Sequence, residues 1–435
     1  MNRFSRVAAT VAATFAALIV ASTVASAQGT APAYKRELPA RLSKQARISE
    51  DSAAAVARAK VPNGKIQSVE LEQEKGRLIY SYDVKIAGKS GIEEVNVNAM
   101  DGTVVGVEHE SPSDEKKEVA GEYRVTAHYP LGGEGGWDYV SIDTARHRVF
   151  IGRDNRVMVV DEATGKLISE IGGKLNRVHG VAFSYGTGHG FITSGGDSTV
   201  TMFDLATLAV LGTTTAADDA DAILFDKATG NVFTMNGDAN SSSVIDAKTG
   251  KRIGTIPLGG KPEFGVSDGA GKLYANIEDR NEIVEVDARA QKVVRRWPLT
   301  GCEGPTGLAI DLAHHHLFSG CRGSKVMAIS DAAAGKVLAT VPIGPGVDAN
   351  AYDPSSGLAF SSNGGDGTLT VVRGDGRGNF AVAQTVQTAP SARTMALDPV
   401  THRIYTVAAK FGTPASGQRR PPVMPGTFEM LVLER

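Results

Sequence analysis

Alternation of apolar and polar residues dominates the chain from residue 121 onwards. In residues 136–173, four short runs carry apolar or β-branched residues with a period of two: YVSID, RVFIG, VMVVD and LISEI. Gly, Asp and Asn residues separate these runs, as they do in tight turns. The pattern predicts a four-stranded antiparallel sheet of about 40 residues, which is the length of one blade of a β-propeller. One such sheet cannot bury both of its faces and needs copies to pack against.

Copies of the pattern follow at a nearly constant spacing. One turn position recurs at steps of 41, 42, 42, 43, 42 and 45 residues, at Asp143, Ser184, Asp226, Asp268, Asp311, Asp353 and Asp398. The seventh repeat ends in FEMLVLER, residues 428–435, with a third strand and no fourth. We therefore expect residues 123–131, YRVTAHYPL, to supply the missing strand and to close a ring of seven sheets, because closure protects the edges that an open array exposes.

The first 27 residues have the pattern of a secretory signal. Arg3 and Arg6 precede an uncharged stretch at residues 7–24, and Ala25-Ser26-Ala27 fits a cleavage site, so the mature chain is expected to begin at Gln28. The alternative is that the stretch is kept as a membrane anchor. No later segment has the length of a membrane span. The sequence therefore predicts a soluble protein that is periplasmic or secreted, without a membrane span after signal cleavage.

Composition narrows the class of partner. The chain has 46 Lys and Arg and 48 Asp and Glu, a formal net charge of -2 that becomes -4 when the two signal arginines are removed. This mildly acidic balance argues against nucleic acid as a partner. The 50 glycines suit a fold with many tight turns. We expect a monomer whose partner is a small ligand or an envelope protein.

The pattern differs between the signal and the repeats. Residues 28–44 are rich in Ala, Pro, Lys and Arg and are expected to form a flexible leader. A helix is predicted over residues 48–61, capped by Ser49 or Asp51, and three or four strands are predicted among residues 65–74, 76–86, 91–99 and 103–110. Residues 45–110 then form a small α+β domain, and the charged residues 111–120 form a linker.

Residues 48–110 resemble a PepSY domain. The resemblance lies in the helix with SAAAVARA, the strand LIYSYDVKI and the ending EEVNVNAMDGTVVGV. Asn98 departs from the pattern, since the family usually has Asp in this last turn. The resemblance implies a small exported module that binds or inhibits and does not catalyse a reaction.

The repeats resemble the YVTN, or YncE-like, family of seven-bladed propellers. The matching motifs are FITSGGDSTVTMFDLAT, SVIDAKTGKRIGTIPLGGKP and IEDRNEIVEVDA, and the resemblance covers residues 121–435. It implies an exported binding or scaffold protein without an agreed reaction. The predicted fold class is thus mainly β, a seven-bladed β-propeller with a small N-terminal α+β (PepSY-like) domain.

Candidate ligand-binding residues occupy one equivalent position of the repeats, five residues before the turn marker. This ring position holds Asp138, His179, Asp221, Glu263, Thr306, Asp348 and Arg393, and Trp137 lies beside it, where its ring would stack on a bound group. Two carboxylates about 8 Å apart repel each other by roughly 2 kcal/mol at an effective dielectric of about 20. A bound cation, a cationic ligand or a raised carboxylate pKa would relieve this repulsion. The alternative is a water-filled channel without a ligand.

Three functional classes follow from this ring. The first is a binding or scaffold protein that holds a small ligand or a partner protein at the ring face. The second is a metal-dependent hydrolase of the lactonase or esterase type, with a divalent cation at Asp138, Asp221, Glu263 and Asp348 and with His179 as base, because carboxylates and imidazole suit such ions. The third is a structural envelope protein, whose ring would be empty.

Three further features are set apart by their residue types. Cys302 and Cys321 belong to the fifth repeat of an exported chain and are expected to form a disulfide. Residues 410–426, KFGTPASGQRRPPVMPG, are the longest connection between a second and a third strand and are expected to lie over the ring as a lid or partner loop; the alternative is an irregular insertion. His314-His315-His316 is expected to form a solvated turn at the far end of its blade and not a metal site.

Overall fold

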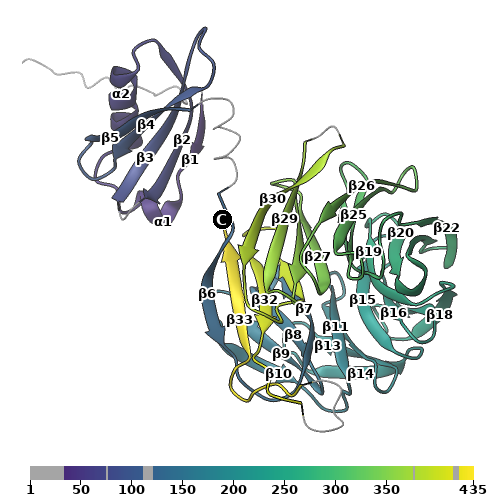
Figure 1. Cartoon of the computed structure of the whole chain (residues 1–435). Coiled ribbons are helices and arrows are strands. Elements are labelled where there is room, and N and C mark those ends of the chain that lie inside the picture. The colour runs from purple at the N-terminus through teal and green to yellow at the C-terminus, as the bar shows by residue number, and fades with distance from the viewer. Residues whose placement is uncertain (1–33, 75–76, 111–120, 376–377, 415–420) are drawn as a thin grey trace, which may run out of the picture. The chain divides into compact units, whose positions relative to one another are not determined.

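The chain divides into two compact units, residues 1–119 and residues 120–435, and each is described by itself. The computed structural model describes residues 34–74, 77–110, 121–375, 378–414 and 421–435 (Figure 1). These residues are mainly β, with repeated four-stranded sheets. The expected signal at residues 1–27 and the expected linker at residues 111–120 lie outside them.

The small unit is one sheet with helices beside it. Its strands lie in the order β1 (Lys35–Glu37), β2 (Gly64–Glu74), β3 (Arg77–Ile86), β4 (Ile92–Asn98) and β5 (Val104–Glu110), and its helices are α1 (Ala40–Ser43) and α2 (Glu50–Lys60). The side chain of Ser49 caps α2 by accepting a hydrogen bond from Ser52 N at 3.2 Å. The alanines of α2 are small enough to bring the helix close to Tyr80, Tyr82 and Val84 of β3, with which they form one core.

Residues 34–44, which the sequence assigned to a flexible leader, instead form β1 and α1. β1 pairs in parallel with β2, with Lys35 opposite Ser68. Tyr34 packs against the core and donates its hydroxyl to Glu50 Oε1 at 2.7 Å. The three residues of β1 are all charged and exposed, so the strand has no apolar alternation that would predict it from the sequence. It forms because the edge of β2 offers backbone groups with which it can pair.

The large unit contains seven four-stranded sheets within its described residues, and each sheet has the same order of strands. The first strands are β7 (Trp137–Asp143), β11 (Val178–Ser184), β15 (Ala220–Asp226), β19 (Pro262–Ser267), β23 (Pro305–Asp311), β27 (Val347–Asp353) and β31 (Met395–Leu397). The second strands are β8 (Arg148–Arg153), β12 (His189–Ser194), β16 (Asn231–Asn236), β20 (Lys272–Ile277), β24 (His316–Cys321), β28 (Leu358–Asn363) and β32 (Ile404–Ala408). The short 3₁₀ helices η1 (Thr144–Arg146) and η2 (Glu278–Arg280) lie in two of the connections.

The outer half of each sheet is formed in the same way. The third strands are β9 (Arg156–Asp161), β13 (Thr199–Asp204), β17 (Ser241–Asp246), β21 (Glu282–Asp287), β25 (Val326–Asp331), β29 (Thr368–Gly374) and β33 (Glu429–Glu434). The fourth strands are β10 (Leu167–Ile171), β14 (Val210–Thr215), β18 (Arg252–Pro257), β22 (Lys292–Pro298), β26 (Lys336–Pro342), β30 (Phe380–Gln387) and β6 (Arg124–Pro130). β6 comes from the start of the unit and pairs with β33, with His128 opposite Leu431. This is the segment that the sequence predicted to complete the last sheet.

The first strands of successive sheets contact one another in chain order, and β31 of the last sheet also contacts β7 of the first. The sheets in Figure 1 accordingly lie face to face around a common centre. Apolar clusters fill the spaces between neighbouring sheets; in one of them Phe150 of the first sheet packs against Phe183 and Phe203 of the second.

The recurring aspartates are turn residues. Asp226, Asp311, Asp353 and Asp398 follow the pattern in which a carboxylate accepts hydrogen bonds from backbone N–H groups two or three residues further on. The aspartates that end third strands act in the same way; Asp204 accepts from Thr207 N at 2.7 Å. The spacing visible in the sequence is therefore the spacing of turns between strands one and two and between strands three and four.

A β-bulge interrupts the pairing of the fourth strand in each of the seven sheets. In the first sheet Leu167 pairs with Val160 and Ser169 pairs with Val159, so that Ile168 is the extra residue. A bulge twists an exposed edge away from other chains, and these fourth strands are the outer edges of their sheets.

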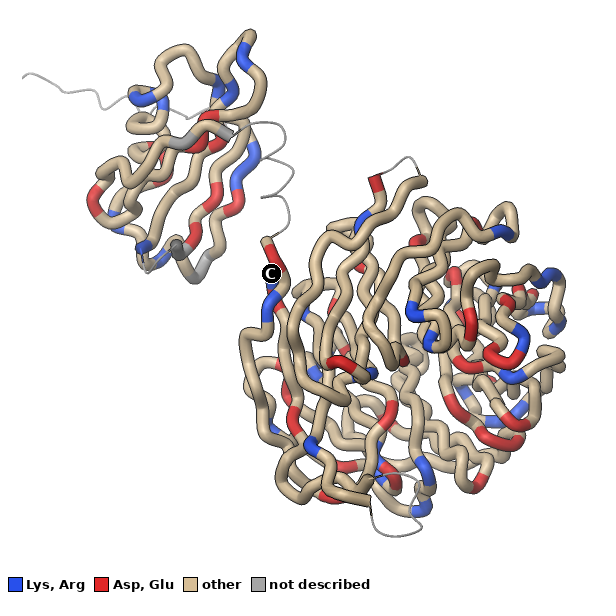
Figure 2. Tube along the Cα trace, in the orientation of Figure 1, with Lys and Arg blue, Asp and Glu red and all other residues tan. Residues whose placement is uncertain are grey.

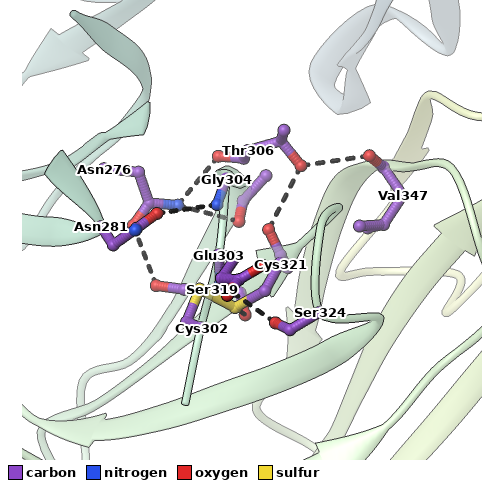
Figure 3. The surroundings of a disulfide bond; sticks show 12 residues. Asn276, Asn281, Cys302, Glu303, Gly304, Thr306, Ser319, Cys321, Ser324 and Val347 are labelled. Carbon is purple, nitrogen blue, oxygen red and sulfur yellow. Dashed lines mark hydrogen bonds between the residues drawn. A yellow bond between two sulfur atoms is a disulfide. The ribbon is translucent and has the colours of Figure 1, made fainter. Parts of the chain in front are cut away.

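Cys302 and Cys321 form a disulfide in the fifth sheet, which confirms the pairing expected from the sequence. Both residues are buried, and their Cα atoms are 5.3 Å apart. Figure 3 shows the bond between β24 and the connection that precedes β23, where Gly304 N donates to Asn281 Oδ1 at 2.8 Å.

Acidic and basic residues are interspersed along the described trace of both units (Figure 2). Among the described residues, no helix has the length and apolar character needed to cross a membrane.

Candidate ligand-binding cavity

Six of the seven ring residues owe their position to β-bulges in the first strands. In β7 the pairing shifts between Trp137 and Val140, and in β15 it shifts between Ala220 and Ile223. The same irregularity occurs in β11, β19, β23 and β27. A bulge bends the strand and changes the direction of the side chain that it carries. The ring position lies within each of these irregular stretches, so the bulges account for the convergence of its side chains.

Buried polar side chains stabilise the bulges from the preceding sheet. Thr394 Oγ1 donates to Asp138 O at 2.8 Å, and Thr193 Oγ1 donates to Asp221 O at 2.5 Å. Asn276 Nδ2 likewise donates to Thr306 O at 2.8 Å. Because these donors are buried, each bond fixes the carbonyl of a ring residue and so the backbone that carries its side chain.

The ring residues line a cavity of about 1230 Å³. Those that contribute to its wall are Trp137, Asp138, His179, Asp221, Glu263, Asp348 and Arg393. Thr306 does not, although the sequence placed it with the others. Its side chain is fully buried, and its hydroxyl lies 3.2 Å from Gly320 O and 3.1 Å from Val347 O. Thr306 is therefore a connection between sheets.

Trp137 lines the cavity, but other residues already cover its ring. The ring stacks on Phe411 with 5.8 Å between centroids, and it packs against Phe428 at 5.3 Å. The guanidinium of Arg393 lies 5.5 Å from its centroid. The expectation that Trp137 stacks on a bound group is thus weakened, since its surface is engaged within the protein.

Two arginines hold Asp348. Arg393 Nε donates to Asp348 Oδ2 at 2.7 Å, and Arg322 Nη2 donates to Asp348 Oδ1. Burial raises the pKa of Asp348, while Arg322 and Arg393 oppose this shift. Arg393 also donates to Trp137 O at 2.7 Å and lies 3.8 Å from Asp138 Oδ1. This part of the ring is paired internally.

His179 joins two carboxylates. Its Nδ1 is hydrogen-bonded to Asp138 Oδ2 and lies 3.1 Å from Asp221 Oδ1. On the other side of the ring, Nε2 accepts a hydrogen bond from Arg177 Nε at 3.2 Å. An acceptor at Nε2 places the imidazole proton on Nδ1, toward the carboxylates. Both nitrogens are therefore engaged within the protein.

Arg177 and Asp219 reach this cluster from a strained backbone. Arg177 has a φ of 53° and Asp219 a φ of 58°, while the equivalent positions in two later repeats are Gly304 and Gly346. A left-handed conformation costs a non-glycine residue about 1 kcal/mol or more. Arg177 Nη2 donates to Asp219 Oδ1, so the two strained residues form an ion pair beside His179.

Glycine residues leave space for the side chains of His179 and Asp219. A Cβ at residue 195 would lie 2.7 Å from His179 Nε2, and a Cβ at residue 237 would lie 2.6 Å from Asp219 Oδ2. Both residues follow second strands, and their turns approach the ring closely. The glycine runs of these turns therefore have a packing role here.

Asp221 and Glu263 are the ring carboxylates without a cation that neutralises them fully. Burial first, and then the charges of Asp138 and Glu263, raise the pKa of Asp221 well above its ordinary value. Burial and the neighbouring carboxylates Glu278 and Asp348 raise the pKa of Glu263 to about 7. Among the described residues, no hydrogen bond or ion pair reaches the Glu263 side chain.

Tyr139 is a further residue of the cavity lining. It lines the cavity from β7 and packs edge-on against Phe264 of β19, with 5.3 Å between ring centroids. Tyr139 belongs to the same core as Ala222 of the third sheet. Burial and the carboxylates Asp221 and Glu263 raise the pKa of the phenol well above its ordinary value, so that the hydroxyl keeps its proton.

An apolar wall faces this acidic floor. Phe411, Pro422, Val423 and Pro425 line the cavity. Phe411 and Val423 form an isolated β-bridge, and Gly412 N donates to Pro422 O at 2.8 Å. The described ends of the insertion at residues 410–426 thus form part of the wall; its residues 415–420, with Arg419 and Arg420, lie outside the described part of the chain.

The candidate metal ligands are only partly brought together. Asp138, His179 and Asp221 each offer a ligand atom within 4.8 Å of the others. Glu263 and Asp348 are not members of this group. A metal at His179 Nδ1 would require the proton to move to Nε2, where Arg177 now donates. The donor types suit a divalent ion, but the hydrogen bonds favour a protonated Nδ1.

Several residues of the cavity escaped the sequence analysis. Tyr139 lies one residue after a ring position, and Arg177 lies two residues before one. Arg322 lies in a turn after a second strand. One signal was present: the position after each ring residue holds Tyr139, Gly180, Ala222, Phe264, Gly307, Ala349 and Thr394, so two large rings stand among small residues. The other two gave no signal, because their roles depend on contacts between sheets.

His314 lies outside the cavity. Its Nδ1 is hydrogen-bonded to Asp311 Oδ2 at 2.6 Å, and its side chain is largely exposed. His314 and His316 stack with 5.8 Å between centroids. Among the described residues, the metal-type cluster of Asp138, His179 and Asp221 does not include them.

Comparison with known proteins identifies the small unit only. Residues 47–108 match the PepSY family, described as "Peptidase propeptide and YPEB domain". No curated protein matches the chain. A solved structure of Kuenenia stuttgartiensis hydrazine synthase is similar at 15% identity, over 56% of this chain and 96% of that chain, with a TM-score of 0.42. A PepSY domain and a disulfide together fit an exported protein.

Proposed function

We propose that residues 121–435 form a closed seven-bladed β-propeller of the YVTN/YncE-like kind in a periplasmic or secreted protein. Support comes from the seven sheets, from the contacts of each first strand with the next, and from the contact of β31 with β7. The completion of the last sheet by β6 also supports closure, because it joins the two ends of the unit.

The function that the geometry supports best is binding: the propeller holds a small ligand in its central cavity. The observation that carries this proposal is the cavity of about 1230 Å³, which is lined by ionisable side chains from several sheets. Ligand pockets typically enclose about 300–1,000 Å³ and combine apolar walls with a few placed polar groups. A water-filled channel would require neither the Tyr139 floor nor the apolar wall. The PepSY domain would then dock or regulate the binding protein.

Native mass spectrometry of the exported protein, purified from an envelope without chelator, tests this function. A bound small molecule should appear as a mass adduct and should be absent from Glu263→Arg, which fills part of the cavity and reverses a charge. Glu303→Arg is the matched control, since Glu303 is exposed and does not line the cavity. An adduct retained in Glu263→Arg, or a partner protein bound equally by both variants, would contradict the proposal.

A metal-dependent hydrolase of the lactonase or esterase type is the second candidate, because Asp138, His179 and Asp221 converge. A metal there would polarise a carbonyl or activate water. Elemental analysis of the wild type and of Asp138→Ala/Asp221→Ala distinguishes the two functions. A stoichiometric metal that the double variant loses would favour the hydrolase and lead to lactone and ester substrates. No metal in either protein would exclude it.

A further inference from the structure

We propose that the ligand is a small organic cation, whose protonated amine lies between Asp221 and Glu263 and whose carbon skeleton contacts Phe411 and Val423. This inference rests on the proposed binding function and names the chemical class that the cavity accepts. It follows from four features of the described lining: its charge balance, the fixed pairing of its arginines, an unsatisfied acceptor, and the apolar wall.

The charge of the lining is negative. Its carboxylates are Glu134, Asp138, Asp154, Asp221, Glu263 and Asp348, and its guanidinium groups are Arg177, Arg322 and Arg393. Six carboxyl groups therefore face three guanidinium groups. Field lines concentrate in a cavity with low-dielectric walls, so this excess favours a cation over a neutral or anionic molecule.

Each arginine of the lining is already paired with a carboxylate of the protein. Arg322 and Arg393 both bond to Asp348, and Arg177 bonds to Asp219 and His179. An anionic ligand would have to compete with these carboxylates for the guanidinium groups. The guanidinium groups of the lining thus pair with carboxylates of the protein itself.

Asp221 and Glu263 remain for the ligand. Asp221 Oδ1 is buried without a hydrogen-bond partner, because the Nδ1 proton of His179 is directed to Asp138. Lys261, which precedes Glu263 by two residues, donates its Nζ to Glu278 Oε2 at 2.8 Å. An ammonium group has three donors and satisfies two carboxylates and a further acceptor at once.

The wall favours an organic cation over a bare ion. Phe411, Pro422, Val423 and Pro425 offer carbon surface and no oxygen side chain, whereas Ca²⁺ prefers six to eight oxygen ligands. The Tyr139 hydroxyl, held protonated among the floor carboxylates, adds one polar group beside the amine position. A lining that combines carbon surface with carboxylates matches a molecule that has an amine at one end of an apolar body.

Isothermal titration calorimetry with matched probes at pH 8 tests this inference. The probes are phenethylamine, phenethyl alcohol, phenylacetate and CaCl₂, and the proteins are the wild type, Asp221→Asn/Glu263→Gln and Glu303→Gln. We expect the amine to bind more tightly than the other probes, and its affinity to fall by about tenfold or more in the double variant, since charge-assisted hydrogen bonds are lost. Glu303→Gln should bind like the wild type.

The outcomes distinguish a failure of this inference from a failure of the proposed binding function. Equal binding of the alcohol or of phenylacetate, or amine binding unchanged in the double variant, overturns the cation inference and leaves a ligand cavity. Calcium binding without amine binding replaces the organic cation with a metal. If no probe binds but a mass adduct is present, the ligand belongs to another class; if neither is seen, both proposals fail. Circular dichroism of the variants shows that they are folded.

Discussion

The ring of Tyr139 on the first sheet packs edge-on against the ring of Phe264 on the fourth, with 5.3 Å between their centroids. β7 and β19 are not neighbours among the first strands, so this pair crosses the centre of the unit. Both residues follow a ring residue within a bulge. The equivalent residues of the other sheets are small, which leaves room for the two rings to meet.

Tyr139→Ala should remove this closure and destabilise the large unit by about 2–4 kcal/mol, because it deletes a buried ring and leaves a void. Urea unfolding measures the change. Both tryptophans of the chain, Trp137 and Trp297, lie in the large unit, so their fluorescence reports this unit alone. Tyr139→Phe keeps the ring pair and should cost much less. Equal losses in the two variants would show that the hydroxyl, and not the ring, is what matters.

Arg153 holds the rim of the cavity from a fully buried position. Its guanidinium donates to the backbone carbonyls of residues 132, 134, 135 and 136, and it lies 3.8 Å from the centroid of Phe428. Burial lowers the pKa of Arg153 to about 10. No local sequence pattern indicates the burial of Arg153, because it depends on the segment at residues 132–136.

Arg153→Lys should destabilise the large unit by about 2–4 kcal/mol and increase hydrogen exchange at residues 132–136. A lysine has three donors and cannot reproduce the planar fork, so buried carbonyls lose their partners. Arg289→Lys is the control, since Arg289 is exposed and donates to Ala270 O at 2.9 Å, away from residues 132–136. Exchange rates that stay the same in Arg153→Lys would show that the rim is held by other contacts.

The free energy of unfolding should fall as pH rises from about 4.5 to about 7. Burial, Glu278 and Asp348 raise the Glu263 pKa from 4.5 to about 7, so the native state binds more protons than the unfolded state in this window. Stability falls with pH where the native state holds the extra proton. Asp221 contributes with the same sign, because burial and Asp138 raise its pKa.

Glu263→Gln isolates this effect. Gln cannot ionise, so the variant should gain about 2 kcal/mol relative to the wild type at pH 8 and little at pH 4.5. Denaturant unfolding at a series of pH values measures the difference. The same advantage at both pH values would mean that Glu263 titrates as an exposed glutamate does.

The disulfide between Cys302 and Cys321 closes a short loop in the fifth sheet. Cys302→Ala/Cys321→Ala should lower the free energy of unfolding by about 3 kcal/mol, mainly because the unfolded chain gains freedom. Unreduced wild-type protein should show no free thiol by mass spectrometry after alkylation. Two modified thiols, or a variant as stable as the wild type, would contradict the pairing or its contribution.

The candidate cavity was only partly visible in the sequence. Counting back from the turn aspartates found Asp138, His179, Asp221, Glu263, Asp348 and Arg393, because equivalent positions of a repeat are equivalent in space. The same count included Thr306, which is buried between sheets. The repeat specifies the backbone position of a ring residue, whereas the local bulge and the neighbouring sheet decide the direction of its side chain.

The sequence by itself determined the number and spacing of the sheets, the turn aspartates, the origin of the last fourth strand in residues 123–131 and the pairing of the two cysteines. Each of these depends on local chemistry: period-two alternation, carboxylates that accept from nearby N–H groups, and repeat arithmetic. Tertiary structure alone decided that Tyr139 and Phe264 meet, that Arg177 binds His179, that Arg322 and Arg393 hold Asp348, and that residues 35–37 join the small sheet. These contacts join segments far apart in the chain, and their energies depend on burial, which no local pattern encodes.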